Sequence, residues 1–476
     1  MGQEISYSQF EKSDFELFYQ KLKQETELLK KMIEQKACST RSPIAGFEIE
    51  AWILDQNMQP APINDHFLAT LKNPLAFAEL AKFNIELNST PTPLAGNVFS
   101  RMHTQLQSTW DSAFKHAEMT QNQLIMIGTL PTLKQSDLTL ANMSDLNRYH
   151  ALNEQILQSR GKPINLEIVG NEHLKFDHHD VMLESATTSF QIHIQLPLDI
   201  AHHFYNASII SSAAMVALCA NTPFLFGKDL WDESRIPLFE QSIETGGYNG
   251  AAQGPIKRVS FGTDYARHSI FECFIENLEH FPVLLPANLG TTTEAFEHLK
   301  LHNGTIWRWN RPLVGFDDDG TPHIRVEHRP PAAGPTTIDS IANAAFFYGV
   351  AKSLCDEIMD KGIALPFSQA KDNFYQASRY GLESNIIWLD GHKHRLQTLI
   401  RNELIPRAIS GLNSLGVTQS DTDDYLNIIL QRLNNKQNGC QWQRQFIKSE
   451  KDFKRMTQCY LKNQQSGKPV SEWSVD

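Results

Sequence analysis

The sequence predicts an α+β fold in which an antiparallel sheet lies at the centre of a large body. Four segments alternate apolar and polar residues with the period of a strand, at 47–53, 83–88, 190–196 and 324–329. Apolar residues at helical spacing occur at 7–35, 100–127 and 144–160. Strands with one apolar and one polar face are typical of antiparallel sheets, in which only one face packs on the core.

The three predicted helices are bounded by residues that favour helix ends. Ser13 and Glu16 have the spacing of a capping box near the start of the first helix. Gly128 and Pro131 are expected to stop the second helix, and Gly161 the third. The apolar stretch at 207–227 is broken by serine, asparagine and proline, so it predicts a buried helix and not a membrane span.

The length of 476 residues suggests two or three domains. We expect an N-terminal helical segment at 1–35, an α+β body at 36–354 and a mainly helical C-terminal extension at 355–476. Residues 465–476 are polar and are expected to be loosely attached.

The composition excludes several classes of function. The net charge is −11, which argues against a nucleic-acid binder or a polybasic membrane binder, so any phosphate-bearing ligand must be held locally. The six cysteines contain no C-x-x-C pair and support neither a zinc site nor a disulfide framework. With no secretory signal in view, a reducing compartment is expected, and we predict a cytoplasmic location.

The polar faces of the four strands carry unusual residue types. Alternate side chains of a strand line the same face, so residues of one parity are neighbours. The first and second strands contribute carboxylates, the third an imidazole between amides, and the fourth a carboxylate between two arginines. These residues are Glu48 and Glu50; Glu86; Gln191 and His193; and Arg325, Glu327 and Arg329.

For any single strand, a solvent-exposed face explains the polar residues. Exposed faces are usually rich in lysine, threonine and serine, however, and these four strands taken together are not. Neighbouring carboxylates disfavour each other's ionisation unless a cation offsets their repulsion. We therefore predict bound metal, and oxygen ligands with one imidazole favour Mg²⁺ or Mn²⁺. Arginines beside the metal suit phosphate oxygens. No Walker-type phosphate loop occurs, so the sheet and its cations would have to hold a nucleotide.

An ordered set of short motifs adds a family resemblance over roughly residues 44 to 350. The chain resembles the second glutamate–cysteine ligase family, which includes bacterial carboxylate–amine ligases and belongs to the glutamine synthetase superfamily. The motifs are G46-F-E-I-E50, I85-E-L-N88, Q191-I-H193, A220-N-T-P-F224 and R325-V-E-H-R329.

The resemblance implies an antiparallel sheet curved into a funnel, with ATP and divalent metal ions on its concave face. The body at 36–354 would then be the ATP- and metal-binding catalytic domain. By motif position the implied metal ligands are Glu48, Glu50, Glu86, His193 and Glu327.

The same resemblance assigns roles to the arginines. Arg329 would contact the transferred phosphate, and Arg235 would approach the substrate carboxylate or the phosphates. We assign Arg325, Gln191 and Arg308 to cofactor binding. Gln191 stands where relatives often have a histidine, so the resemblance does not define its role.

Several of these residues have an ordinary structural alternative. His193 could be a hydrogen-bonded histidine of a polar core, and Arg329 could form a structural ion pair. Glu184 fits the concave face and an exposed position equally well. The segment at 302–312, with Trp307 and Arg311, fits either a substrate cover or a packed loop.

The predicted function is ATP- and Mg²⁺-dependent ligation of an amino-acid carboxylate to an amine through an acyl phosphate. The expected partners are small-molecule amino acids and ATP, and the sequence is compatible with a homo-oligomer. Two alternatives remain: a kinase of the same superfamily, and a non-catalytic nucleotide-sensing protein that keeps the fold.

Overall fold

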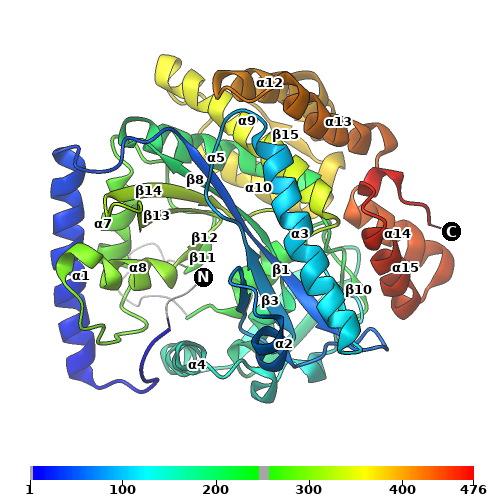
Figure 1. Ribbon diagram of the computed structural model, residues 1–476, viewed down its shortest axis with the longest axis horizontal. Helices are drawn as coiled ribbons and strands as arrows, with labels where there is room; N and C mark the ends of the chain where they lie inside the picture. Colours follow the sequence, from blue (N-terminus) through cyan, green and yellow to red (C-terminus); the bar gives the residue numbers. More distant parts are fainter. Residues whose placement is uncertain (1–3, 246–256, 476) are drawn as a thin grey trace.

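A computed structural model describes residues 4–245 and 257–475 of the chain, and its central sheet contains all four predicted strands (Figure 1). The strand order is β13-β14-β8-β1-β3-β2, and each neighbouring pair is antiparallel. Two further strands, β4 and β5, pair with β1. The bounds are β1 (Ile44–Leu54), β2 (Ala76–Ala78), β3 (Asn84–Asn88), β4 (Thr92–Pro93), β5 (Gln123–Ile125), β8 (Phe190–Leu196), β13 (Asn310–Phe316) and β14 (Pro322–His328). The predicted α+β fold with a curved antiparallel sheet is confirmed.

Helices cover the apolar face of this sheet in layers (Figure 1). Helix α5 (Leu198–Leu218) packs on β13 and β14, and α9 (Thr337–Lys361) packs on α5. Tyr348 of α9 donates its hydroxyl to the backbone carbonyls of Gly46 (3.1 Å) and His193 (2.8 Å). The outer layer contains α3 (Val98–Met119), α12 (Ile405–Ser414) and α13 (Gln419–Asn435). These helices fix the sheet from one side and leave its polar face for the site.

Helix α5 is buried along almost its whole length, as the apolar stretch at 207–227 predicts. Among the described residues, no helix is both long and apolar enough to cross a membrane. 

Further helices and two-stranded sheets surround the central sheet. The helices are α2 (Asn64–Leu71), α4 (Asn147–Arg160), α6 (Arg235–Ser242), α7 (Phe271–His280), α8 (Glu297–Gly304), α10 (Phe367–Tyr380), α11 (Leu396–Leu399), α14 (Gly439–Glu450) and α15 (Phe453–Gln465). The strands form two-stranded sheets: β6 (Ile164–Val169) with β7 (His173–His178), β9 (Phe224–Leu225) with β10 (Lys228–Asp229), β11 (Val259–Ser260) with β12 (Trp307–Arg308), and β15 (Asn385–Ile387) with β16 (Lys393–Arg395).

The N-terminal helix α1 (Lys12–Glu34) lies within the predicted range and packs on α7 and α8 (Figure 1). Its capping box joins Glu11 and Asp14, and not the predicted Ser13 and Glu16, because the helix begins two residues earlier than predicted. Glu25 holds α1 to α8 through a buried contact of 2.6 Å with His298 Nδ1.

The predicted end of the second helix is wrong. Helix α3 ends at Met119, and Gln123–Ile125 form strand β5 next to β1. Gln121 takes a positive φ of 58°, which ends the helical path. Leu124 and Ile125 are both buried, so their burial against the sheet overrides the helical pattern.

The expected loose attachment of the last residues is also wrong. Trp473 is only 5% exposed, and its ring packs edge-on against Trp442 of α14 and Tyr460 of α15. Aromatic burial therefore anchors a segment whose polar composition suggested mobility. The predicted boundary between residues 354 and 355 falls inside α9, so the C-terminal helices continue directly from the body.

Replacing Trp473 by alanine is expected to lower the free energy of unfolding by about 3–5 kcal/mol, because a buried aromatic ring is lost and a cavity remains. Chemical denaturation followed by circular dichroism measures this change. Tyr380→Ala is the matched control, since Tyr380 is 48% exposed. Equal effects of the two substitutions would contradict the burial of the C-terminal segment.

Candidate active site

The polar faces of β14, β8, β1 and β3 form one surface because their residues lie in register. Glu327 stands opposite His193, Glu48 opposite Gln191, and Glu50 opposite Glu86. Glu48 and Gln191 are therefore neighbours across adjacent strands, as are His193 and Glu327, although each pair lies more than 130 positions apart in the sequence. The structure brings all five predicted metal ligands to this surface, where they form two groups.

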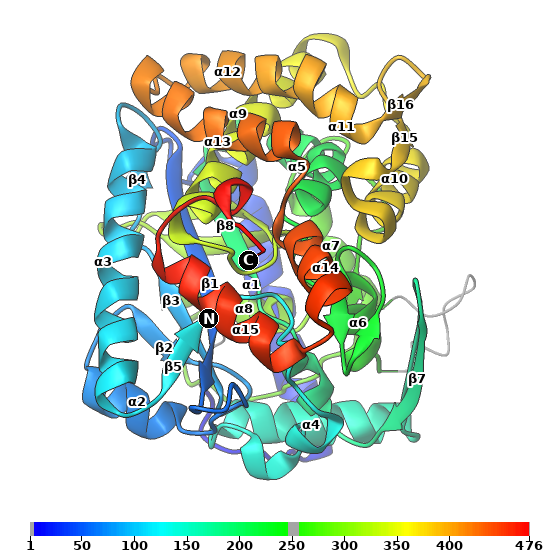
Figure 2. The same cartoon turned by 90° about the vertical axis from the view of Figure 1, so that its right-hand side faces the viewer.

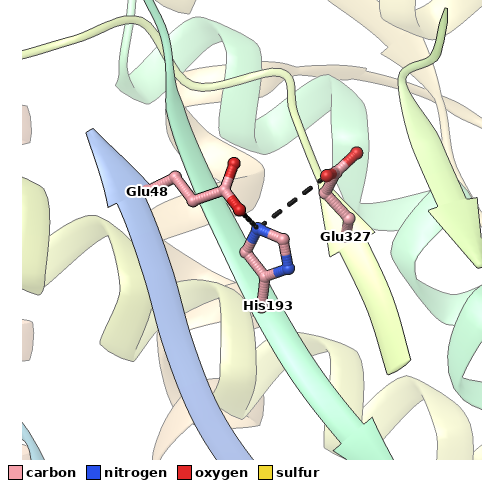
Figure 3. A group of neighbouring side chains, drawn as sticks. All are labelled: Glu48, His193 and Glu327. Atoms are coloured by element: carbon pink, nitrogen blue, oxygen red, sulfur yellow. Dashed lines mark ion pairs between the residues drawn. The ribbon is translucent and has the colours of Figure 1, made fainter. Parts of the chain in front are cut away.

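The first group, called here the histidine group, consists of Glu48, His193 and Glu327 (Figure 3). One ligand atom from each residue lies within 4.8 Å of the others. His193 Nε2 lies 3.4 Å from Glu48 Oε1 and 3.8 Å from Glu327 Oε1. Among the described residues, this buried nitrogen has no hydrogen-bond partner. A buried imidazole nitrogen without a partner, placed between two carboxylates, fits a divalent metal ion.

The second group, called here the carboxylate group, consists of Glu50, Glu79 and Glu86, again within 4.8 Å of one another. Glu50 accepts hydrogen bonds from the backbone N–H (2.7 Å) and the hydroxyl (2.8 Å) of Ser189. Three carboxylates that offer only oxygen atoms suit Mg²⁺ or Mn²⁺.

Mutual repulsion shifts the titration of the carboxylate group. Burial, together with the charges of Glu48 and Glu50, raises the pKa of Glu86 to about 7. Burial and the neighbouring Glu86 and Glu50 raise the pKa of Glu79 well above its ordinary value. Burial and the charge of Glu50 also raise the pKa of Glu184 to about 8, so Glu184 belongs to the same acidic surroundings. A bound cation would remove this repulsion.

Two arginines compensate the negative charge of the histidine group. Arg311 binds Glu327 through a fork, with Nε at 2.9 Å and Nη2 at 3.1 Å from the two carboxylate oxygens. Arg329 Nη1 donates to Glu327 Oε2 at 3.0 Å. Burial opposes ionisation of Glu327, but the two guanidinium groups hold its pKa well below the usual range. Burial lowers the pKa of His193 to about 4, which keeps the imidazole neutral, the form that binds metal.

Gln191 connects the two groups. Its amide donates to Glu50 Oε1 (3.1 Å), and its oxygen accepts a hydrogen bond from Arg329 Nη1. A glutamine can donate and accept at once, so this one side chain orients a carboxylate on one side and a guanidinium on the other.

Arg235 binds the backbone of the segment that carries Arg329. Its Nη2 donates to the backbone carbonyl of Arg329 (3.1 Å), and its Nη1 donates to that of Pro330 (3.1 Å). Nη1 also pairs with Glu233 Oε1 at 3.2 Å. Arg235 is only 3% exposed, and its contacts show that it holds the backbone of Arg329 in place.

The other two predicted cofactor residues differ in position. Arg325 lies near Glu48 and His193, and its buried Nε has no hydrogen-bond partner among the described residues. Arg308 is not brought to either group: it pairs with Glu276 (3.1 Å) and Asn277 (3.0 Å) of α7.

In the segment at 302–312, Arg311 reaches the site and Trp309 packs in the core. Trp309 is 1% exposed, and its Nε1 donates to Glu240 of α6 (2.9 Å).

Glu79 is a site residue that the sequence did not predict. It directly follows β2, and the hairpin from β2 to β3 returns the chain to Glu86. β2 is only three residues long, so no alternating pattern marked it. The available signal was a carboxylate seven positions before a predicted ligand, at the distance of a short hairpin.

Comparison with known proteins identifies the family of the chain. The profile of glutamate–cysteine ligase family 2 matches residues 44–456. The fold and the two ligand groups define an enzyme of the carboxylate–amine ligase class. The chain belongs to glutamate–cysteine ligase family 2, which confirms the resemblance found in the sequence.

Two solved structures are similar to the chain. The crystal structure of the glutamate–cysteine ligase (gshA) of Francisella tularensis in complex with AMP has a TM-score of 0.53 at 10% identity. The similarity covers 92% of this chain and 91% of that one. The bifunctional glutathione synthetase of Pasteurella multocida has a TM-score of 0.48 at 10% identity, over 92% of this chain and 54% of that one. No curated protein sequence matches the chain.

The pH dependence of stability tests the acidic surroundings of the carboxylate group. Glu184 has a folded-state pKa of about 8, above its usual 4.5, so between these values the folded chain holds more protons than the unfolded chain. Stability contributed by protonated Glu184 is therefore lost as pH rises. In chelator-treated protein, the midpoint of thermal unfolding should fall between about pH 6.5 and 8, and it should fall less in Glu184→Gln.

The control is Glu172→Gln, because Glu172 lies at the surface beside Lys228. Added Mg²⁺ should also flatten the slope in the unaltered chain by offsetting the carboxylate charges. The same slope in Glu184→Gln as in the unaltered protein would contradict the burial of this carboxyl group near Glu50.

Proposed function

We propose that the chain joins the carboxylate of one amino acid to the amine of another in a reaction that consumes ATP and requires Mg²⁺ or Mn²⁺. The observation that carries the proposal is the pair of ligand groups on one surface with Arg329 bound between them. Divalent ions, when bound, neutralise phosphate oxygens and help to align the γ-phosphoryl group. Glu48, His193 and Glu327 would hold one ion, and Glu50, Glu79 and Glu86 another.

The residues of the chain then act on the substrate carboxylate. A carboxylate is a poor electrophile, so it must first receive the phosphoryl group and become an acyl phosphate. Arg329 stabilises the charge on the moving phosphoryl group through its planar fork. Arg325 binds phosphate oxygens with its free Nε. The amine then attacks the acyl carbon and releases phosphate. The buried surface excludes water, which would otherwise hydrolyse the intermediate.

The electrostatics of the two groups support an order of ion binding. The carboxylate group has excess negative charge before any ligand arrives, whereas Arg311 and Arg329 already compensate Glu327. The carboxylate group should therefore bind an ion without nucleotide, and the histidine group should gain its ion together with the phosphates.

The family name points to glutamate and cysteine as the substrates. All six cysteines of the chain are free, which supports the proposed cytoplasmic location. 

The decisive experiment measures ADP release over pairs of amino acids, with mass spectrometry of the product. We expect ADP release that depends on both amino acids and a product that contains an amide bond. Glu86→Gln should abolish this activity and weaken Mn²⁺ binding at least about tenfold, measured by calorimetry without nucleotide. It should not lower the unfolding midpoint in chelator, because it removes one of the repelling carboxylates.

Two outcomes would overturn the proposal. A phosphorylated amino acid that accumulates without a second substrate would identify a kinase. A protein that binds nucleotide but consumes no ATP with any pair would support the non-catalytic alternative.

Arg329→Lys should lower kcat about 100-fold while the KM for Mg·ATP changes much less, because the charge stays and the planar fork is lost. Steady-state kinetics over a range of ATP concentrations measure both constants. Arg258→Lys is the control, since Arg258 is a buried arginine bound to Thr305, away from both ligand groups. Equal changes in kcat and KM would mean that Arg329 holds ground-state ATP instead.

A further inference from the structure

In Figure 2, helix α15 lies in front of β1, and α14 packs beside α15. Buried polar side chains of the two helices form hydrogen bonds with Asn221, Met126 and Pro335 in the segments around the site. The residues involved are Gln443 of α14 and Tyr460 and Gln464 of α15, each at most 4% exposed. The side-chain nitrogens of the two glutamines and the hydroxyl of Tyr460 find their partners in the loops around the site and not within their own helices.

Asn221 is bound by side chains from both helices. It is fully buried, and its side-chain Nδ2 donates to the hydroxyl of Tyr460 (2.9 Å) and to the carbonyl of Ala333 (2.8 Å). Its Oδ1 accepts from Gln443 Nε2 (2.9 Å), which also donates to the Asn221 carbonyl (3.0 Å). One asparagine therefore joins α14, α15 and the segment that follows β14.

The backbone of Asn221 extends the chain of contacts to Arg235. Its N–H donates to Glu233 Oε2 (3.1 Å), and Glu233 Oε1 pairs with Arg235. Arg235 in turn holds the carbonyls of Arg329 and Pro330. The contacts thus run without a break from the C-terminal helices to the backbone of Arg329.

A second route reaches the same segment. Gln464 binds both backbone groups of Met126, accepting from its N–H (3.1 Å) and donating to its carbonyl (2.8 Å). Its amide also donates to the carbonyl of Pro335, six residues after Arg329. Tyr460 donates to the Met126 carbonyl at 3.1 Å.

The fit between α14 and Asn221 leaves no space. A Cβ atom at Gly439, the first residue of α14, would lie 2.0 Å from Asn221 Oδ1. The helix can approach this closely only because the residue is glycine. Close approach and complete pairing together restrict Asn221 to one orientation.

We propose that α14 and α15 position the catalytic Arg329, with Tyr460 and Gln443 acting through Asn221 and Arg235 as positioning residues. The proposal rests on the role proposed above for Arg329. The C-terminal helices thereby set the distance between Arg329 and the two ligand groups, in addition to closing the core.

Tyr460→Phe tests this proposal because it removes only the hydroxyl and keeps the ring packing against Trp442 and Trp473. We expect kcat to fall about tenfold, since small displacements of a reacting group are costly, while the KM for Mg·ATP changes less than about threefold. Tyr425→Phe is the matched control: Tyr425 is a buried tyrosine of α13 whose ring packs on Phe99 and His103 of α3. It should leave both constants unchanged.

A double-mutant cycle separates positioning from general stability. If Tyr460 acts through Arg329, the loss of kcat from Tyr460→Phe should largely disappear in the Arg329→Lys background, because the fork that it positions is already gone. Equal losses in both backgrounds, or an unchanged kcat in Tyr460→Phe, would overturn the proposal.

Hydrogen exchange gives a readout that does not require activity. In Tyr460→Phe, the amides of residues 332–334 and 125–128, and that of Arg329, should exchange faster, and in Tyr425→Phe they should not. Unchanged exchange in these segments would overturn the proposal even if the chain proved to have no ligase activity. A chain without ligase activity but with the expected exchange would contradict only the proposed function.

Discussion

Repulsion between carboxyl groups on one largely buried surface is the constraint on which the rest of this structure depends. Glu50, Glu79, Glu86 and Glu184 stand close enough that ionisation of one opposes ionisation of the next. A surface of this kind stays in place only if the backbone beneath it is rigid. The register of four antiparallel strands and the two helical layers behind them supply that rigidity, and Tyr348 fastens the layers to the strand backbones.

The ligand strands could be predicted from the sequence because their signal is local. Alternation with period two places Glu48 with Glu50, and Arg325 with Glu327 and Arg329, on shared faces whatever the rest of the chain does. The order of strands, and hence the pairing of Glu50 with Glu86, does not follow from the alternating pattern and is given by the structure. The end of α3 was predicted wrongly because Leu124 and Ile125 continue an apolar pattern that only tertiary pairing with β1 resolves.

The residues that the sequence did not predict depend on contacts between distant segments. Glu79 joins the carboxylate group because a hairpin returns it to Glu86, and Arg311 becomes a partner of Glu327 because β13 pairs with β14. The attachment of Trp473 depends on ring contacts with α14 and α15 that exist only in the folded chain. Local propensity does not predict such contacts, because they form between segments that are far apart in the sequence.

The single imidazole among the ligands makes the two groups chemically unlike. The carboxylate group presents only hard oxygen donors, whereas His193 adds a softer nitrogen to the histidine group. Ions late in the first transition series prefer nitrogen donors, so Zn²⁺ or Ni²⁺ would enter the histidine group more readily than the carboxylate group. Ni²⁺ or Zn²⁺ added together with the nucleotide would accordingly load the histidine group first, while the carboxylate group would keep Mg²⁺ or Mn²⁺.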